Sequence, residues 1–172
     1  MKRTIHVVAH LIWCFYLLAI GQGYAQNQAP ASLSADFSFT IEAEIAQPLE
    51  MGDTIDGKRL SIPITGGKFY GDDIKGDILP GGADYQVIRN DGVVMLHAVY
   101  MIKTEDGVLI NVVNDGLIVP AQDDKPGYFR TSPRFIAPQG KYDWLNKAIF
   151  VCSVRGNPAK QNSIFIDVYR LK

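Results

Sequence analysis

Apolar and polar residues alternate with a period of two along much of this chain, and this alternation constrains its fold more than any other feature. Residues 37–45, FSFTIEAEI, place phenylalanine, isoleucine and alanine at every second position and serine, threonine or glutamate between them. Such a pattern is typical of a half-buried β-strand. Six more strand-like segments follow, at residues 58–71, 83–90, 93–104, 108–119, 148–155 and 163–171.

A helical period of 3.6 residues is not sustained in any stretch of the sequence. The best helical candidate is KYDWLNK, residues 141–147, which is long enough for one or two turns. Roughly eight strands at hairpin spacing, several of them apolar on both faces, predict an all-β fold. We expect a single small antiparallel β-barrel of the calycin-like kind over residues 36–172, with a tight sandwich as the alternative. Closure would remove exposed strand edges.

The first 25 residues have the composition of a secretory signal. Lys2 and Arg3 precede an apolar run, and small residues, Gly23 and Ala25, stand at the −3 and −1 positions of a cleavage site. The run is short for a transmembrane helix. We therefore expect cleavage after Ala25, a periplasmic or secreted protein without stable membrane insertion, and a flexible lead-in over residues 26–35.

Composition excludes several classes of function. Residues 26–172 carry 15 basic and 18 acidic residues with no basic run, which argues against a nucleic-acid partner. His97 and Cys152 are the one histidine and the one cysteine of this segment, so an intrachain disulfide is impossible and a zinc site is not indicated. We expect no metal and no cofactor.

Two adjacent glycines in LPGG, residues 79–82, raise the question of a phosphate-binding loop. Such loops open a helix, whereas the residues that follow here are strand-like. Pro80 and Gly81 instead fit the second and third positions of a type II turn, with positive φ at Gly81.

The dipeptides Asp91-Gly92 and Asp106-Gly107 predict two-residue hairpin loops of type I′. That geometry pairs Asn90 with Val93 and Met101 with Val112, and its alternation gathers polar residues on one face of a three-stranded sheet. The predicted polar island consists of Asp84, Gln86, His97 and Asn114. The sequence does not decide which face lines the interior.

His97 beside Asp84 has two interpretations. A histidine next to a carboxylate can act as an acid or a base near neutral pH, which gives a candidate catalytic pair. Alternatively, His97 has only a structural role in the barrel, and its ring forms hydrogen bonds with Asp84 and Gln86.

Further candidate ligand contacts lie outside this pair. Gln86 and Asn114 belong to the predicted island, and Arg89 and Tyr100 lie on the opposite predicted face. Tyr128 and Arg130 share one side of an extended segment, where they could bind a carboxylate or could simply be solvated. Trp144 is a candidate contact as well, although it could equally cap one end of the barrel.

The order of the segments ITGGKFYGDDIKGDILPGGADY, LHAVYMIKTEDGVLINVVNDG, YFRTSPRF and YDWLNKAIFV resembles the family called domain of unknown function 3237, or UPF0311. The resemblance covers roughly residues 37–171 and implies a small antiparallel β-barrel, but it implies no general activity. Where the family usually reads Leu-Asp-Ala-Arg-Tyr, this chain has Leu96-His97-Ala98-Val99-Tyr100, so a site built on that acid and base would be altered.

Three functions remain open at this point. The first is an exported barrel that binds a small organic molecule at its mouth. The second is an enzyme of lyase, isomerase or hydrolase type that uses His97 with Asp84 for proton transfer. The third is a structural barrel that associates with further copies of itself.

Overall fold

The computed structural model describes residues 32–172, in which Leu33–Lys172 form one compact unit. The signal peptide and most of the lead-in predicted from the sequence lie outside the described residues. None of the described helices is long and apolar enough to cross a membrane. The described chain contains ten strands and one short 3₁₀ helix: β1 Ala35–Ile45, β2 Leu49–Thr54, β3 Gly57–Tyr70, β4 Lys75–Ile78, β5 Gly82–Ile88, β6 Val94–Thr104, β7 Leu109–Val119, β8 Tyr128–Ile136, η1 Asp143–Lys147, β9 Phe150–Gly156 and β10 Ser163–Leu171.

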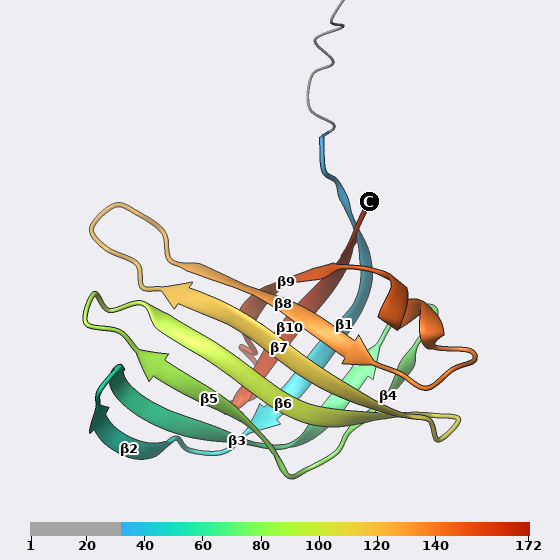
Figure 1. Cartoon of the computed structure of the whole chain (residues 1–172), viewed down its shortest axis with the longest axis horizontal. Coiled ribbons are helices and arrows are strands. Elements are labelled where there is room, and N and C mark those ends of the chain that lie inside the picture. The colour runs from blue at the N-terminus through green and yellow to red at the C-terminus, as the bar shows by residue number, and fades with distance from the viewer. Residues whose placement is uncertain (1–31) are drawn as a thin grey trace, which may run out of the picture. The chain divides into compact units, whose positions relative to one another are not determined.

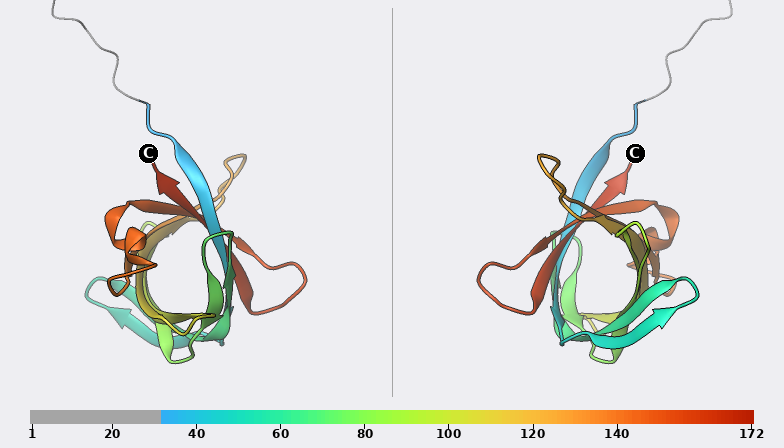
Figure 2. Two further views of the ribbon diagram at one scale, coloured as in Figure 1. Left: turned by 90° about the vertical axis from the view of Figure 1, so that its right-hand side faces the viewer. Right: turned by 90° about the vertical axis from the view of Figure 1, so that its left-hand side faces the viewer.

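The strands form a closed antiparallel barrel with eight strand positions, which confirms the predicted fold class. Neighbouring strands run β1, β10, β9, β8, β7 and β6, and pairing of β1 with β3 closes the ring. β1 and β2 follow one another along one side of β3, while β4 and β5 do the same along its other side. The views along the barrel in Figure 2 show the ring, with the β2–β3 hairpin projecting from it.

Pro80 and Gly81 interrupt a strand instead of reversing the chain. β4 and β5 both pair with β3 on one side and with β6 on the other, and both run antiparallel to them. Gly81 has φ +107°, the positive value that the predicted turn requires. The interruption therefore shifts the register between β4 and β5 while the strand position continues, and it delivers Asp84 to the wall of the barrel.

The loops that flank β6 contain three residues, so the predicted two-residue type I′ geometry was wrong. In the first hairpin the Arg89 amide donates to the Val93 carbonyl at 2.9 Å, and in the second the Thr104 amide donates to the Val108 carbonyl at 2.9 Å. The glycines that end the loops, Gly92 and Gly107, have φ values of +84° and +87°. Positive φ at the last residue of a three-residue loop is the common alternative to type I′.

Each longer loop moves the pairing of β6 by one residue. Ile88 pairs with Val94 and Asp84 with Ala98, where the two-residue loop would have paired Asp84 with Val99. In the second hairpin Ala98 pairs with Asn114 and Tyr100 with Val112. A shift of one residue turns every side chain of a strand to the other face. The two shifts leave β5 and β7 on a common face, and only β6 is reversed relative to the prediction.

One end of the barrel is filled by aromatic side chains. Phe39, Phe69, Phe135 and Phe150 are almost completely buried, and Phe135 packs edge-on against Phe150 with ring centroids 5.2 Å apart. The predicted short helix is present as η1, whose Leu145 is buried beneath the same cluster. Figure 1 shows η1 beside the end of β8 and the start of β9. The aromatic side chains therefore fill this end of the barrel.

Gly82, at the start of β5, occupies a position where no side chain fits. A Cβ atom there would lie 2.6 Å from the Val99 carbonyl oxygen and would also overlap the Tyr100 side chain. Gly156, at the end of β9, has no heavy atom within 4 Å of the corresponding point. The close approach of β5 to β6 therefore depends on Gly82.

We predict that Gly82→Ala lowers the free energy of unfolding by about 1–3 kcal/mol, the usual effect of forcing atoms into a filled space. Gly156→Ala is the matched control and is expected to stay within about 0.5 kcal/mol of the parent protein. Urea denaturation followed by circular dichroism measures both values. Equal stability of the two variants would contradict the packing described for β5 and β6.

Candidate functional site

The half of the barrel opposite the aromatic end contains a cavity of about 290 Å³. Inward side chains of β1, β3 and the strands from β5 to β10 line it. The apolar wall consists largely of isoleucines: Ile45, Ile62, Ile64, Ile118, Ile164 and Ile166. Loops of residues 89–93, 120–127 and 157–162 connect the strands at this end. A volume of this size lies near the lower limit of small-molecule sites in proteins.

Asp84 brings a carboxylate to the cavity wall. Its Oδ2 accepts a hydrogen bond from Gln86 Nε2 at 2.6 Å, and its Oδ1 accepts one from the His97 backbone amide at 3.1 Å. Burial raises the pKa of the Asp84 carboxyl above its usual value, although both hydrogen bonds oppose the rise. The carboxyl group is thus fixed in orientation and poorly solvated.

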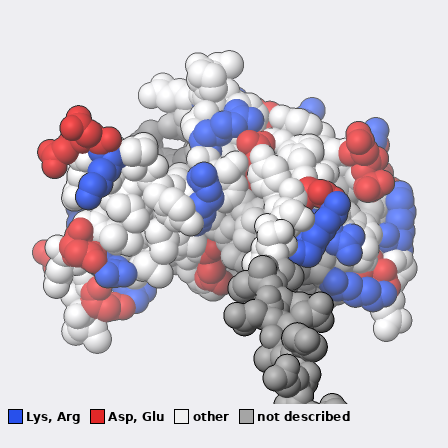
Figure 3. Space-filling view, turned by 90° about the horizontal axis from the view of Figure 1, so that it is seen from above, with Lys and Arg blue, Asp and Glu red and all other residues white. Residues whose placement is uncertain are grey.

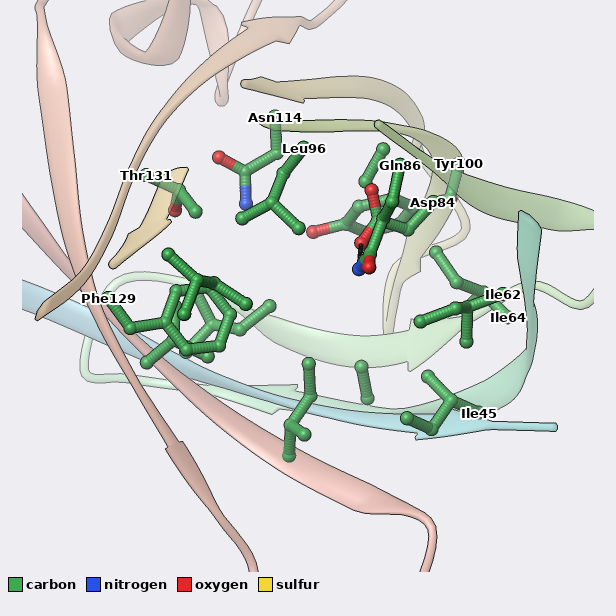
Figure 4. Close-up of a pocket in the computed structure, with 16 residues that line it drawn as sticks. Ile45, Ile62, Ile64, Asp84, Gln86, Leu96, Tyr100, Asn114, Phe129 and Thr131 are labelled. Carbon is green, nitrogen blue, oxygen red and sulfur yellow. Dashed lines mark hydrogen bonds between the residues drawn. The ribbon is translucent and has the colours of Figure 1, made fainter. Parts of the chain in front are cut away.

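Three more polar residues line the cavity, and each has a buried polar atom. The Tyr100 hydroxyl, the Asn114 Oδ1 atom and the Thr131 hydroxyl lack a hydrogen bond to any nitrogen or oxygen atom of residues 32–172, although the Thr131 hydroxyl lies beside the Cys152 thiol. All three residues line the cavity, and Figure 4 shows their side chains directed into the same space as Asp84 and Gln86. Burial raises the pKa of Tyr100, so its hydroxyl remains a hydrogen-bond donor at neutral pH.

An unpaired buried polar atom costs roughly 1–3 kcal/mol, and most buried polar groups in proteins have a partner. Three such atoms around one cavity are therefore unusual. A few polar groups placed around an apolar cavity are typical of small-molecule binding sites.

His97 does not lie in this cavity, and the prediction that its side chain shares a face with Asp84 was wrong. Its ring points to the outer surface, where Nδ1 lies 2.7 Å from Asp115 Oδ1. Both of these side chains are more than half exposed. The three-residue loops explain the difference, because they reverse β6 and leave only the His97 backbone amide in contact with Asp84.

The same reversal brings three other residues of β6 inward. Leu96, Ala98 and Tyr100 line the cavity, although the sequence prediction had placed them on the opposite face from Asp84. Gln86 and Asn114 are inside, in agreement with the prediction that they share a face with Asp84. The positions at which this chain departs from the usual family pattern, His97 and Val99, are on the outer surface, whereas Leu96, Ala98 and Tyr100 keep it.

The remaining candidates do not reach the cavity. Arg89 is exposed and pairs with Asp91, and Arg130 is exposed and lies with its guanidinium carbon 5.4 Å from the centroid of the Tyr128 ring. Trp144 packs against Phe150 at the aromatic end, with centroids 6.0 Å apart. The extended segment predicted around Tyr128 and Arg130 is β8, which lies between β7 and β9 in the barrel wall.

Arg130 and Tyr128 border a shallow surface hollow that also includes Asp115. A carboxylate at its border does not favour an anionic ligand. In the face seen in Figure 3 acidic and basic side chains are interspersed, without a broad area of one charge.

Cys152 is buried, and burial raises the pKa of its thiol to about 12. It is therefore protonated and unreactive at neutral pH. Residues 32–172 contain no cluster of three or more His, Cys, Asp or Glu side chains placed to hold a metal ion.

Tyr100 and Tyr142 allow a direct test of the unpaired hydroxyl. Both are 4% exposed, but the Tyr142 hydroxyl donates to Asp106 Oδ1 at 2.8 Å. Tyr100→Phe should leave the free energy of unfolding unchanged or raise it by up to about 1 kcal/mol, whereas Tyr142→Phe should lower it by about 1 kcal/mol or more. Urea denaturation measures both, and a clear loss of stability in Tyr100→Phe would show that its hydroxyl has a structural partner.

Comparison with known proteins places the chain among proteins of similar sequence and fold. A UPF0311 protein of Rhodopseudomonas palustris is 35% identical over 153 residues, which cover 81% of this chain and 97% of that protein. A crystal structure of a conserved protein of unknown function from the same species has 34% identity and a TM-score of 0.74, with 83% of this chain and 99% of the other covered.

Two further structures share the fold. A β-barrel-like protein of Acinetobacter baumannii has 31% identity and a TM-score of 0.75, covering 84% of this chain and 99% of its own. An enzyme of Penicillium herquei has a TM-score of 0.67 at 21% identity, covering 84% and 98% of the two chains. This last likeness concerns the fold alone. The model of the family described as protein of unknown function (DUF3237) matches residues 33–171, and the chain therefore belongs to the DUF3237, or UPF0311, family.

Proposed function

We propose that the protein binds a small, largely apolar organic molecule in the barrel cavity. The observation that carries this proposal is a cavity with apolar walls whose lining includes Tyr100, Asn114 and Thr131, each with a buried polar atom that lacks a nitrogen or oxygen partner among residues 32–172. An apolar wall with a few fixed polar groups is the usual construction of a small-molecule site. Barrels of eight strands are wide enough to hold one small ligand.

The charge in the cavity favours neutral or cationic ligands. Asp84 is the one acidic or basic residue among those that line it in the described structure. An anionic ligand would meet a poorly solvated carboxylate without a cation to offset the repulsion. The cavity volume of about 290 Å³ corresponds to a molecule of one or two rings.

The isoleucines give a site-specific test of binding. Methyl groups of Ile62, Ile118 and Ile164 line the cavity, whereas those of Ile41, Ile102 and Ile110 lie in the packed core. In protein labelled at isoleucine methyl groups, the neutral two-ring probes indole and 2-tetralone should shift the first set in NMR spectra and leave the second set largely unchanged. Shifts confined to the core set, or the absence of shifts with every neutral probe up to millimolar concentration, would contradict the proposal.

Three variants at two positions of β6 make this test more specific. Ala98→Phe places a ring inside the cavity and should weaken binding more than tenfold, and Ala98→Leu should have a smaller effect in the same direction. Val99→Phe adds the same ring on the outer face of the same strand and should leave binding within about twofold. The methyl spectra also report whether each variant is folded.

We further propose that residues 1–25 direct export, since they combine a basic start, an apolar run and a Gly-x-Ala cleavage site. The full chain expressed in a Gram-negative bacterium should appear in the periplasmic fraction. Its intact mass should correspond to a protein that begins at Gln26. Recovery of the uncleaved chain from the cytoplasm would contradict export.

A further inference from the structure

We infer that the cavity is a catalytic site, in which Asp84 and Tyr100 transfer a proton at a carbon atom next to the carbonyl group of a bound cyclic ketone. This inference rests on the proposed ligand binding and adds a reaction and a substrate class to it. It follows from the placement of a carboxylate and a phenol side by side, on the neighbouring strands β5 and β6, along one wall of a poorly solvated cavity.

Asp84 has the surroundings of a general base. Gln86 and the His97 amide each donate one hydrogen bond to its carboxylate, and these bonds fix its orientation while leaving further lone pairs free for a bound molecule. A carboxylate held in an apolar wall binds a proton more readily than one in water. Such a group can take a proton from carbon if the resulting charge is stabilised nearby.

Tyr100 supplies that stabilisation. Its hydroxyl is buried, has no hydrogen-bond partner among residues 32–172 and points into the cavity that Asp84 faces (Figure 4). Its donor capacity is therefore available to an oxygen atom of the ligand. A hydrogen bond from a fixed donor in a site of low polarity stabilises an enolate more strongly than the neutral ketone, because the charge on the oxygen increases during the reaction.

The reaction needs no other reactant. Asp84 removes the proton from the α-carbon, the electron pair of the C–H bond forms a C=C bond, and the π electrons of the carbonyl move to its oxygen, which accepts the Tyr100 hydrogen bond. Return of the proton from Asp84 to the same carbon restores the ketone, and its return to a conjugated carbon isomerises a double bond. Atoms and electrons balance within the ligand and the Asp84 carboxyl group.

Asn114 and Thr131 have a different part in this arrangement. They lie across the cavity from Asp84 in Figure 4, where the amide nitrogen of Asn114 points into the cavity and can donate a hydrogen bond to a polar substituent at the other end of the ligand. Such contacts would orient the α-carbon toward Asp84 without taking part in proton transfer. The best substrates are therefore expected to be cyclic ketones that have an apolar body and a second substituent able to form a hydrogen bond.

Deuterium exchange tests the inference with a simple probe. 2-Tetralone is neutral, has two rings and carries an acidic C–H group between its aromatic ring and its carbonyl. In D₂O, the proton held by Asp84 exchanges with solvent deuterium before it returns to carbon, so the protein should accelerate loss of the C1 proton signal in ¹H NMR above the buffer rate. Asp84→Asn and Asp84→Ser should lower the accelerated rate by about 10²-fold or more, and Tyr100→Phe by about 10–10³-fold.

Two controls separate the roles of the residues. Arg130→Ala should leave the rate unchanged, because its guanidinium is exposed and lies over the Tyr128 ring, outside the cavity lining. The rate should rise with pH as Asp84 ionises, through a range above the usual carboxyl pKa, and this rise should be absent in Asp84→Asn. Tyr100 is the other titratable residue that lines the cavity in residues 32–172, and burial keeps it protonated over that range.

The isoleucine methyl spectra recorded on the same samples distinguish the possible failures. Binding of 2-tetralone without accelerated exchange, or exchange that persists in both Asp84 variants, would overturn the catalytic inference and leave the proposed ligand binding intact. Failure of 2-tetralone to bind while indole binds would overturn the ketone class. Failure of both probes would overturn the inference together with the proposed function.

Discussion

The register of β6 is the constraint on which the rest of this structure depends. Backbone hydrogen bonds fix β6 between β5 and β7, and the loop at each of its ends sets which residues pair. Gly92 and Gly107 adopt positive φ at the ends of three-residue loops, a conformation that costs glycine little and most other residues more. Because side chains alternate along a strand, these two loops decide that Tyr100 faces the interior and His97 the solvent.

The two halves of the barrel differ in how completely side chains fill them, and the candidate functional site lies in the less completely filled half. Four phenylalanines and η1 pack one end without leaving much space, whereas isoleucines and alanines line the other end around the cavity. Polar groups are concentrated where the packing stops: Asp84, Gln86, Asn114 and Thr131 all lie along the cavity. A barrel built only for stability would fill this space with apolar side chains.

Strand alternation predicted the all-β fold, with a closed barrel preferred to a sandwich, and most strand boundaries, while the segment at residues 141–147 predicted the short helix. β2, with the sequence LEMGDT, is almost entirely exposed and carries no apolar alternation, β4 has only four residues, and β8 was considered from the sequence only as an extended segment. Asp84, Gln86 and Asn114 were correctly placed on one face, since equal register errors at the two ends of β6 cancel between β5 and β7. The error in β6 itself arose because an Asp-Gly dipeptide suits either a two-residue loop or a three-residue loop ending in glycine. Tyr100 was therefore assigned to the face opposite Asp84.

The most direct test of this account is a crystal structure of the protein grown with 2-tetralone. We expect electron density for the ligand inside the barrel, with its carbonyl oxygen within hydrogen-bond distance of the Tyr100 hydroxyl and its C1 atom facing the Asp84 carboxylate. A well-ordered cavity filled by protein side chains, or a β6 strand whose His97 ring points inward, would contradict it.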